Sequence, residues 1–567
     1  MREKIWNYKN KAFSKEEIEA FSASCGISPA MAVILMNRGI KTEKAVSSYL
    51  RKSLEDIHNP FMLDDMEEAS ERILSALDKK EKIVIYGDYD VDGITATSVV
   101  YEFLKSQGAD VSYYIPDRFS EGYGINVLAI NKIARNGAKL MITVDCGITA
   151  VGEVEFAKTQ GLDIIITDHH TCREELPKAV AVINPKRPDS SYPFPHLAGV
   201  GVAFKLILAL AIKLGIPTKE VFMEYVDMVA LGTIADVVPL TGENRVIADK
   251  GINAIENTKN KGMKALLDIA GAGGKSVDVN SVAFFASPRL NAAGRLENAS
   301  LSVELMTCRD DGRAKEIAEH LEELNSKRKA IEQKIFDEAY RQAEEMPEDT
   351  LVYVIVGENW NHGVIGIVAS RLSEMFYRPC ILISVENGKG KGSGRSVPEM
   401  NLFDALSDSE ELLTAFGGHS QAAGLSVTEE NIPEFTNKIN EFAKKTIDVA
   451  SLVPKLYIDC NLSGASVTMQ SAKMLETLAP FGEGNEVPVF SMQGLKVMAV
   501  QSMGADKKHL RLRLSDGNGI FNAVGFGMGE YEEVIKQGMT VNVAFNMNIN
   551  TYQGSESLQL ILKDIKF

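Results

Sequence analysis

Short apolar runs alternate with helical stretches from residue 82 to about residue 170, and this alternation constrains the fold more than any other feature of the chain. Each run ends at polar or glycine-rich residues, and the runs cover residues 83–86, 111–115, 140–144 and 164–167. Strands that alternate with helices in this way form a mostly parallel, doubly wound sheet. We therefore expect an α/β fold in this part of the chain.

Acidic residues and histidines stand at the ends of these predicted strands. In chain order they are Asp88, Asp90, Asp92, Asp145, Asp168, His169, His170 and, after a later apolar run, Asp236. A single Asp after a strand is more often a helix cap or a turn residue than a metal ligand. That interpretation would have to hold separately at four strand ends, whereas α/β sheets bind their ligands where the carboxyl ends of strands meet. One shared site is the better interpretation.

The chemistry of these side chains favours a divalent metal ion. Mixed carboxylate and imidazole ligands suit Mn²⁺ or Mg²⁺. Two such ions make a bound water acidic and offset the charge that develops on a phosphoryl group. The pattern therefore predicts two-metal hydrolysis of phosphoesters.

The formal net charge of the 567 residues is −16, from 61 Lys and Arg against 77 Asp and Glu. This balance counts against a broad basic surface for nucleic acid, but it is compatible with a confined groove. No apolar run approaches the roughly 18 residues of a membrane span, and the N-terminus has no apolar signal core. The six cysteines form no C-x-x-C pair. We expect a cytoplasmic protein without a membrane segment.

The rest of the chain shows three further patterns. Residues 15–80 are typical of short amphipathic helices, and residues 305–347 of one long amphipathic helix that connects two lobes. A second α/β unit follows from about residue 351 to about residue 445. Alternating apolar residues in roughly the last 110 positions predict a small all-β barrel, for which an OB-fold is a candidate.

Motifs in family order between residues 87 and 424 resemble the DHH phosphoesterase superfamily, which is named after its Asp-His-His triplet. Within it, the chain is similar to the RecJ-type exonucleases, which degrade single-stranded DNA from the 5′ end. The motifs are GDYDVDGITAT (87–97), IPDRFSEGYG (115–124), TVDCGIT (143–149), TDHH (167–170), GVGVAFK (199–205), LGTIADVVPL (231–240), SPRLNAAGR (287–295) and GGHSQAAG (417–424).

This resemblance, with the helical pattern at the N-terminus, implies a succession of domains. We expect an N-terminal helical cap at residues 1–60, a DHH catalytic domain at 61–265, a linker with the long helix at 266–349, a DHHA1 domain at 350–447 and an OB-fold that binds nucleic acid at 450–567.

The resemblance also implies roles for the acids and histidines. The implied ligands of two Mn²⁺ ions, with Mg²⁺ as the alternative, are Asp90, Asp92, Asp145, His169 and Asp236. Asp88 and His170 would line the same site as catalytic residues, through proton transfer or phosphate contacts.

Two further groups of residues are expected to bind the substrate. Loops of small residues in the second lobe hold Arg395, Ser396 and His419. Glycine spacing alone would indicate ordinary turns, and only the resemblance makes these residues a binding site for phosphate, at the 5′ end of the DNA. The motif at 287–295 would add phosphate contacts or support for the site, through Arg289, Asn291 and Arg295.

Cationic and aromatic residues elsewhere indicate a path for a single strand. Arg118, Phe119 and Tyr123 combine one cation with two aromatic rings, as single-strand grooves do, although each could instead be a packing residue. Arg511 and Arg513 alternate with leucines on one strand face, which is either solvated or a cationic groove. The resemblance favours the groove.

These observations predict a metal-dependent exodeoxyribonuclease that hydrolyses single-stranded DNA from the 5′ end, releases 5′-mononucleotides and acts in DNA repair and recombination. A helicase and a single-strand-binding protein are candidate partners. Two alternatives remain open: a DHH-type phosphodiesterase of oligonucleotides or cyclic dinucleotides, and a non-catalytic DNA-binding scaffold. The C-terminal barrel argues against the first, because a small substrate needs no extended groove, and the complete set of acids and histidines argues against the second.

Overall fold

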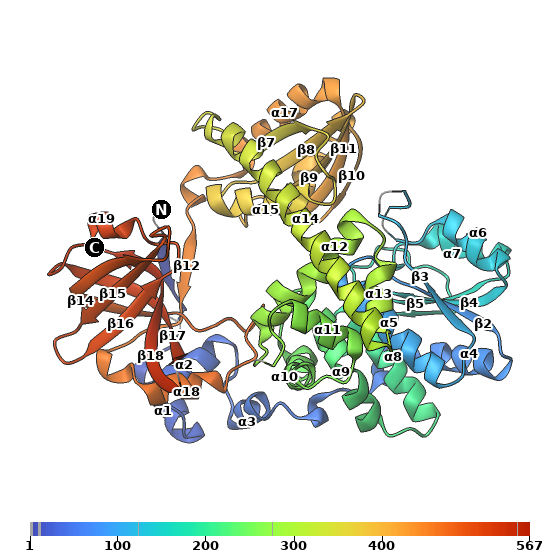
Figure 1. The fold of residues 1–567 in the computed structure, drawn as a ribbon, viewed down its shortest axis with the longest axis horizontal. Helices are drawn as coiled ribbons and strands as arrows, with labels where there is room; N and C mark the ends of the chain where they lie inside the picture. Colours follow the sequence, from blue (N-terminus) through green and yellow to red (C-terminus); the bar gives the residue numbers. More distant parts are fainter. Residues whose placement is uncertain (1–3, 10–12, 119, 123, 275, 553) are drawn as a thin grey trace. The chain divides into compact units, whose positions relative to one another are not determined.

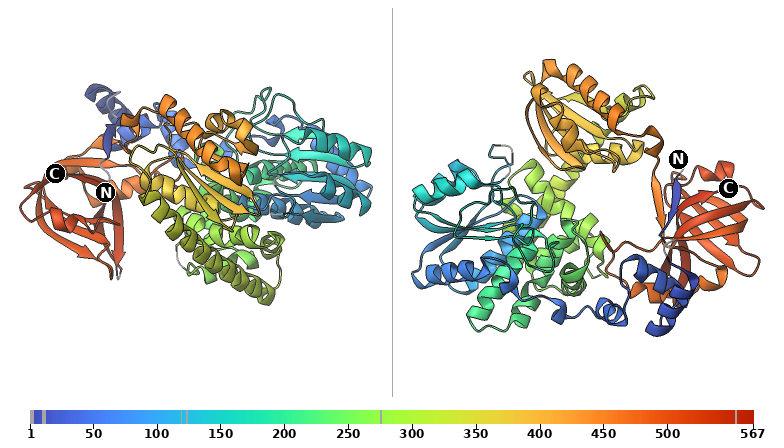
Figure 2. Two further views of the ribbon diagram at one scale, coloured as in Figure 1. Left: turned by 90° about the horizontal axis from the view of Figure 1, so that it is seen from above. Right: turned by 180° about the vertical axis from the view of Figure 1, so that it is seen from behind.

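The computed structural model describes residues 4–9, 13–118, 120–122, 124–274, 276–552 and 554–567. The chain forms two compact units, and each is built from separate segments (Figures 1 and 2). The larger unit comprises Asn59–Val238 and Lys250–Val453. The smaller unit comprises the chain up to His58, together with Pro239–Asp249 and Pro454–Phe567.

A five-stranded parallel sheet begins the larger unit, with the strand order β3-β2-β4-β5-β6. Its strands are β2 (Lys82–Tyr86), β3 (Val111–Tyr114), β4 (Ala138–Val144), β5 (Asp163–Thr167) and β6 (Ala181–Ile183). The chain passes from β2 to β3 on one side of β2 and then to β4 on the other side. A topological switch point, where such sheets bind ligands, therefore lies between β2 and β4.

Helices cover both faces of this sheet (Figure 1). On one face, α6 (Val127–Arg135) and α7 (Val151–Thr159) share a buried apolar cluster with alternate residues of the strands. On the other face lie α4 (Met66–Asp78), α5 (Val91–Ser106) and α8 (Gly199–Lys213). Because both faces are covered, the strands are almost wholly apolar. This confirms the predicted doubly wound α/β fold.

Further helices complete the first lobe of the larger unit and lead to its second lobe. They are α9 (Thr218–Ala235), α11 (Lys261–Ile269), the π-helical segment η4 (Ser281–Ala286), α12 (Ser287–Leu296), α13 (Ser300–Met306) and α14 (Asp311–Glu344), while α10 (Gly242–Glu256) begins in the smaller unit and ends in the larger one. The long helix α14 contacts α11, α12 and α13 and continues into the second lobe (Figure 1). It is the connector that the sequence predicts.

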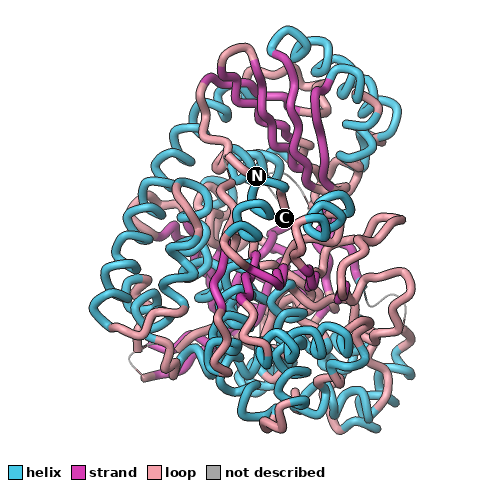
Figure 3. The backbone as a smooth tube through the Cα atoms, turned by 90° about the vertical axis from the view of Figure 1, so that its right-hand side faces the viewer, coloured by secondary structure: helices cyan, strands magenta, loops and turns pink. Residues whose placement is uncertain are grey.

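The second lobe contains a mixed sheet with the order β10-β11-β9-β8-β7. Its strands are β7 (Tyr353–Glu358), β8 (Cys380–Glu386), β9 (Lys389–Arg395), β10 (Leu413–Gly418) and β11 (Ala422–Thr428). The end of α14 and α15 (Ile365–Phe376) pack on one face, and α16 (Leu402–Ser407) and α17 (Ile432–Thr446) pack on the other. Figure 3 shows these strands gathered between helices.

The glycine-rich segment before Ser396 is a strand, and the prediction of a loop there is wrong. Strand β9 lies between β8 and β11 and pairs with both. A Cβ at Gly392 would lie 2.9 Å from the side chain of Leu425, and one at Gly394 would lie 2.8 Å from that of Leu402. Glycine here makes room for neighbouring apolar side chains rather than for a turn. Gly417 and Gly418 likewise belong to β10.

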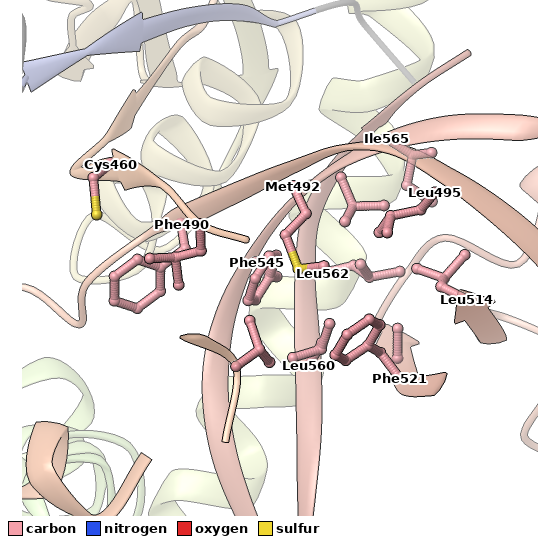
Figure 4. Close-up of a cluster of buried hydrophobic side chains, with 14 of the residues drawn as sticks. Cys460, Phe490, Met492, Leu495, Leu514, Phe521, Phe545, Leu560, Leu562 and Ile565 are labelled. Carbon is pink, nitrogen blue, oxygen red and sulfur yellow. The ribbon is translucent and has the colours of Figure 1, made fainter. Parts of the chain in front are cut away.

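The smaller unit is built around a closed five-stranded barrel, which confirms the predicted OB-like fold. The strand order is β14-β15-β16-β18-β17, and β14 also pairs with β17. The strands are β14 (Phe490–Met503), β15 (His509–Ser515), β16 (Ile520–Gly525), β17 (Thr540–Tyr552) and β18 (Ser555–Lys566). Figure 4 shows apolar side chains such as Phe490, Phe545 and Leu560 in its core.

N-terminal segments complete the barrel unit. They are β1 (Ile5–Tyr8), α1 (Lys15–Cys25), α2 (Pro29–Asn37) and α3 (Glu43–Arg51). Met31, Ile34 and Leu35 of α2 belong to the same buried cluster as the barrel residues. Strand β1 pairs in parallel with β12 (Lys455–Ile458). None of the described helices is long and apolar enough to cross a membrane by itself; α1 and α2 reach that length and composition only together, across a bend of 103°.

Candidate metal centre

The first acidic motif bends tightly between β2 and α5, at the switch point of the sheet. Asp90 caps α5, because its carboxylate accepts a hydrogen bond from the backbone N–H of Gly93 at 3.1 Å. A Cβ at Gly93 would lie 2.7 Å from both the Cβ and the backbone nitrogen of Asp88, so glycine permits the bend. Asp88, Asp90 and Asp92 therefore gather at the carboxyl end of β2.

The N-terminus of α8 orients Asp92. The two carboxylate oxygens of Asp92 accept hydrogen bonds from the backbone N–H groups of Gly199 and Val200, each at 2.7 Å. Backbone N–H groups at a helix N-terminus carry partial positive charge and favour a carboxylate. A Cβ at Gly199 would lie 2.4 Å from Oδ1 of Asp145. Glycine at this position thus lets α8 approach two acids at once.

His169 joins the acids into one cluster. Its Nε2 lies 3.2 Å from Oδ1 of Asp145, 3.6 Å from Oδ2 of Asp236 and 3.8 Å from Oδ2 of Asp92. Three sets of side chains have ligand atoms that all lie within 4.8 Å of one another: Asp88, Asp90 and Asp145; Asp92, His169 and Asp236; and Asp145, His169 and His170. Because Asp145 and His169 each belong to two sets, the sets adjoin. The structure thus brings together every predicted metal ligand and both predicted catalytic residues.

The buried acids of this cluster favour the binding of a cation. Among the described residues, Oδ1 of Asp88, Oδ1 of Asp145 and Nδ1 of His169 are buried without a hydrogen-bond partner. Burial, and then repulsion by neighbouring acids, raises the pKa of Asp88, Asp92 and Asp145 well above the ordinary value. The same causes raise the pKa of Asp236 to about 7. A divalent cation would offset these charges and occupy the unpartnered oxygens, so the residues fit such an ion.

The histidine of the cluster is in the form that binds metal. Burial, followed by the positive charge of His170, lowers the pKa of His169 to about 3. The imidazole of His169 is therefore neutral, which is the state in which a ring nitrogen coordinates a metal ion.

Metal binding should depend on pH with a definite sign. The pKa of Asp236 rises from 3.8 to about 7 on folding, so the folded cluster holds protons more tightly than the unfolded chain. Between pH 3.8 and about pH 7, the contribution of the cluster to the free energy of unfolding therefore decreases as the pH rises. A bound cation replaces these protons, so it stabilises the fold most where the protons have been lost. We expect Mn²⁺ to raise the Tm clearly more at about pH 8 than at about pH 6. Calorimetry with and without Mn²⁺ tests this, and equal increases would contradict it.

Asp168 positions the histidines and belongs to none of the three ligand sets. Its carboxylate accepts hydrogen bonds from the backbone N–H groups of Ile148, His169 and His170 at 2.9, 2.7 and 3.1 Å. Its Oδ1 also lies 2.7 Å from Nδ1 of His170. Burial is the largest single cause and opposes both charges. The contact with His170 and the backbone N–H donors together outweigh burial for Asp168 and lower its pKa, and the contact with Asp168 and the charges of neighbouring acids together outweigh it for His170 and raise its pKa. The sequence did not predict this role, although Asp168 stands in the triplet itself.

The motif at residues 287–295 supports the acidic loop. Oδ1 of Asn291 accepts a hydrogen bond from the backbone N–H of Val91 at 3.1 Å, at the start of α5. Arg289 is buried, forms an ion pair with Glu322 of α14 and donates a hydrogen bond to the carbonyl of Phe285 at 2.6 Å. Both side chains therefore hold helices in place around the cluster.

Three predicted arginines influence one another beside the acidic loop. The guanidinium of Arg118 lies 4.9 Å from the centre of the Tyr89 ring. Arg295 donates a hydrogen bond to the carbonyl of Gly363 in the second lobe at 2.7 Å. Burial, and then the positive charge of Arg118, lowers the pKa of Arg295 to about 10 and also lowers the pKa of Arg395. Such a concentration of positive charge favours an anion such as phosphate.

The predicted phosphate-binding residues of the second lobe stand at the ends of β9 and β10, the two strands that pair with β11. Arg395 ends β9 and donates hydrogen bonds to Oγ of Ser393 and to the carbonyl of Gly394, at 3.2 and 2.8 Å. The hydroxyl of Ser396 donates to the carbonyl of Met400 at 2.8 Å. His419 follows β10 directly and is exposed.

The remaining predicted residues lie outside the described residues or in the smaller unit. Phe119 and Tyr123 lie outside the described residues. Arg511 and Arg513 are exposed on β15 of the smaller unit, while Leu512 between them is buried in the barrel core. The alternation thus places both arginines on the outer face of the barrel.

Comparisons with known proteins identify the family. Three family models match the chain: "DHH family, N-terminal domain" at residues 82–233, "DHHA1 domain" at 348–445 and "RecJ OB domain" at 458–564. The single-stranded-DNA-specific exonuclease RecJ of Bacillus subtilis (strain 168) is 39% identical over 552 residues, which cover 97% of this chain and 69% of that protein. The protein of the same name from Escherichia coli (strain K12) is 33% identical over 575 residues, which cover 97% of this chain and 98% of that protein. The chain belongs to the RecJ family.

Solved RecJ structures share this fold. RecJ from Thermus thermophilus, in complex with Mn²⁺, matches with a TM-score of 0.86 and 28% identity, over 99% of this chain and 79% of that one. A structure of exonuclease RecJ bound to manganese matches with a TM-score of 0.61 and 34% identity, over 69% of this chain and 97% of that one. The resemblance to RecJ-type proteins that the motifs predicted is therefore confirmed. Those RecJ proteins bind manganese, in agreement with the ligand chemistry of the cluster in this chain.

Proposed function

We propose that this RecJ-family chain is a metal-dependent hydrolase that degrades single-stranded DNA from the 5′ end and releases 5′-mononucleotides, in DNA repair and recombination. The observation that carries the proposal is the cluster of acids and histidines at the switch point of the sheet. Its relatives from Bacillus subtilis and Escherichia coli are named single-stranded-DNA-specific exonucleases. A scaffold that only bound DNA would gain nothing from buried acids that repel one another.

The metal ligands in this proposal are carboxylates and one neutral imidazole. Two divalent cations, Mn²⁺ or Mg²⁺, would be held by Asp90, Asp92, Asp145, His169 and Asp236. When bound, such cations act as Lewis acids on phosphoryl oxygens and make water acidic enough to attack phosphorus at neutral pH.

Asp88 and His170 would handle the protons of the reaction. Burial and the neighbouring Asp90 raise the pKa of Asp88, so its carboxylate accepts a proton more readily than an ordinary aspartate does. The imidazole of His170 is held by Asp168 at 2.7 Å, and its raised pKa favours the protonated form. His170 is thereby suited to donate a hydrogen bond or a proton to the 3′ oxygen that leaves the terminal phosphodiester.

The arginines would bind the phosphates of the strand. After burial, the positive charge of Arg118 is the next cause that lowers the pKa of Arg295 and of Arg395, so an anionic group between these side chains would relieve their repulsion. We assign the 5′-phosphate to Arg395, with Ser396 and His419 beside it. Asn291 and Arg289 would hold the supporting helices in place beside the acidic loop.

Replacing Arg395 with alanine should weaken recognition of the 5′ end. We expect the KM for a 5′-phosphorylated single strand to rise about tenfold or more, because a charge-assisted contact to phosphate is lost. The KM for a strand with a 5′-hydroxyl should rise much less. Arg341→Ala, at an exposed position on α14, is the matched control. Equal effects on both strands would contradict a contact between Arg395 and the 5′-phosphate.

Several finer assignments extend the proposal. Arg511 and Arg513 would track the backbone of the strand along the barrel, and Phe119 and Tyr123 would stack on bases. Three further statements stay predictions: a helicase and a single-strand-binding protein as partners, a cytoplasmic location, and the domain boundaries given above.

Digestion of labelled strands tests the function directly. Single strands labelled at the 5′ or the 3′ end, with a duplex as control, are incubated with the full chain and Mn²⁺. We expect early release of the 5′ label as a mononucleotide, and little digestion of the duplex. Early release of only the 3′ label would overturn the polarity. Faster turnover of dinucleotides than of long strands would indicate a small-molecule phosphodiesterase.

A further inference from the structure

Two adjacent phenylalanines are exposed next to the helix that supports the acidic loop. Phe284 is 71% exposed and Phe285 is 48% exposed. Both lie in the π-helical segment η4, which continues directly into α12. Val282 and Ala286 of the same segment are almost completely buried. The segment is thus anchored by its small side chains, while its two largest apolar side chains face outward.

This arrangement reverses the usual order of burial. Phenylalanine is among the residues most often buried, and adjacent exposed aromatic side chains mark binding surfaces more often than ordinary surface. Turns of π-helix are rare and occur frequently at functional sites. The two rings therefore have the properties of a contact surface for a ligand with an apolar face.

The position of the rings relative to the metal centre favours the DNA strand as that ligand. The carbonyl of Phe285 accepts a hydrogen bond from the buried Arg289 at 2.6 Å, which fixes the end of η4. Asn291, seven residues beyond Phe284, contacts the backbone of Val91 in the acidic motif. At a rise of about 1.5 Å per residue, the backbone of Phe284 lies roughly 10 Å along the helix axis from that of Asn291. The two exposed rings thus stand on the same helical run as a residue that contacts the acidic motif.

We infer that Phe284 and Phe285 form a stacking platform for bases of the single strand, close to the metal centre. This inference rests on the function proposed above and deepens it. Stacking on an aromatic ring is tolerant of sequence, because every base has a π-face. A nuclease that advances along any strand needs such a contact, whereas hydrogen bonds to base edges would impose a sequence preference.

The test compares long and short substrates in the full-length protein. The variants are Phe284→Ala/Phe285→Ala, Phe284→Trp/Phe285→Trp and, as control, Ile212→Ala. Ile212 is also exposed, but it lies near the end of α8 that is remote from Gly199 and the acids. The measured quantity is kcat/KM with Mn²⁺ on a single strand of about 20 nucleotides, divided by kcat/KM on a dinucleotide.

The expected outcomes differ sharply. Loss of both rings should lower this ratio about tenfold or more, while the tryptophan variant and Ile212→Ala keep the wild-type ratio. A wild-type ratio in the double alanine variant would overturn the platform and leave a protein partner as the occupant of the surface. A similar fall in Ile212→Ala would overturn it as well. If the wild-type protein degraded no single strand, the proposed function would fail, independently of the platform.

Discussion

Asp92→Asn is expected to lower kcat/KM on single-stranded DNA by at least about a thousandfold in Mn²⁺. Asparagine has the shape of aspartate, but it removes a negative charge from the ligand set that contains His169 and Asp236. Its amide NH₂ would also face the backbone N–H of Gly199 or Val200, where a carboxylate oxygen now accepts a hydrogen bond. Both effects oppose cation binding. Steady-state kinetics on a labelled strand measure the loss.

A matched control separates this effect from a general loss of an acid. Asp110 is exposed and lies just before β3, at the amino end of the same sheet. Asp110→Asn should keep wild-type activity. In Asp92→Asn the increase in Tm caused by Mn²⁺ should disappear, whereas Asp110→Asn should keep it. Near-normal activity of Asp92→Asn would remove Asp92 from the metal centre.

Gly199→Ala is expected to lower activity about a hundredfold or more, although no charged group changes. The new methyl group would lie 2.4 Å from Oδ1 of Asp145, so either this carboxylate or the start of α8 must move. Movement of α8 would also break the two hydrogen bonds that orient Asp92. The kcat/KM on single-stranded DNA and the Mn²⁺-dependent increase in Tm should therefore both decrease.

The same substitution at Gly152, also in the first lobe, should preserve activity and stabilise the protein. A Cβ at Gly152, in α7, would meet no described atom within 4 Å. Gly152→Ala should keep full activity and raise the free energy of unfolding by up to about 1 kcal/mol, because alanine favours a helix. Equal losses in Gly152→Ala and Gly199→Ala would show that the predicted clash with Asp145 is not the cause.

The sequence predicts that these acids and histidines lie close together, because they stand near strand ends. Asp145 follows an apolar run directly, and Asp88 and His169 each stand two residues after one. The parallel arrangement of those runs places their ends at one edge of the sheet. That these ends are also neighbours depends on the strand order β2-β4-β5, which the apolar runs alone do not give. The two acids beyond Asp88 in the same motif follow from the tight bend at Gly93.

Other features depend on contacts that no local pattern contains. The role of Gly199 follows from the approach of α8 to Asp145, across more than fifty residues of sequence. Strand β9 has a sequence of low strand propensity, and it is a strand because two neighbours pair with it and fill the space above its glycines. The exposure of Phe284 is equally invisible in the sequence, since an apolar residue at helical spacing is normally expected inside.

The barrel core has a consequence for the order in which the protein can be assembled on the ribosome. Residues of α2, near the start of the chain, are buried against strands that end at Lys566. Strand β1 finds its partner β12 about 450 residues later. The larger unit contains all of its own strands before residue 454 and can close while synthesis continues. The smaller unit cannot close before its C-terminal strands are synthesised, so the apolar side chains of α2 lack their barrel partners until then. A fragment that begins at Pro454 would likewise lack the part of the barrel core that α2 supplies.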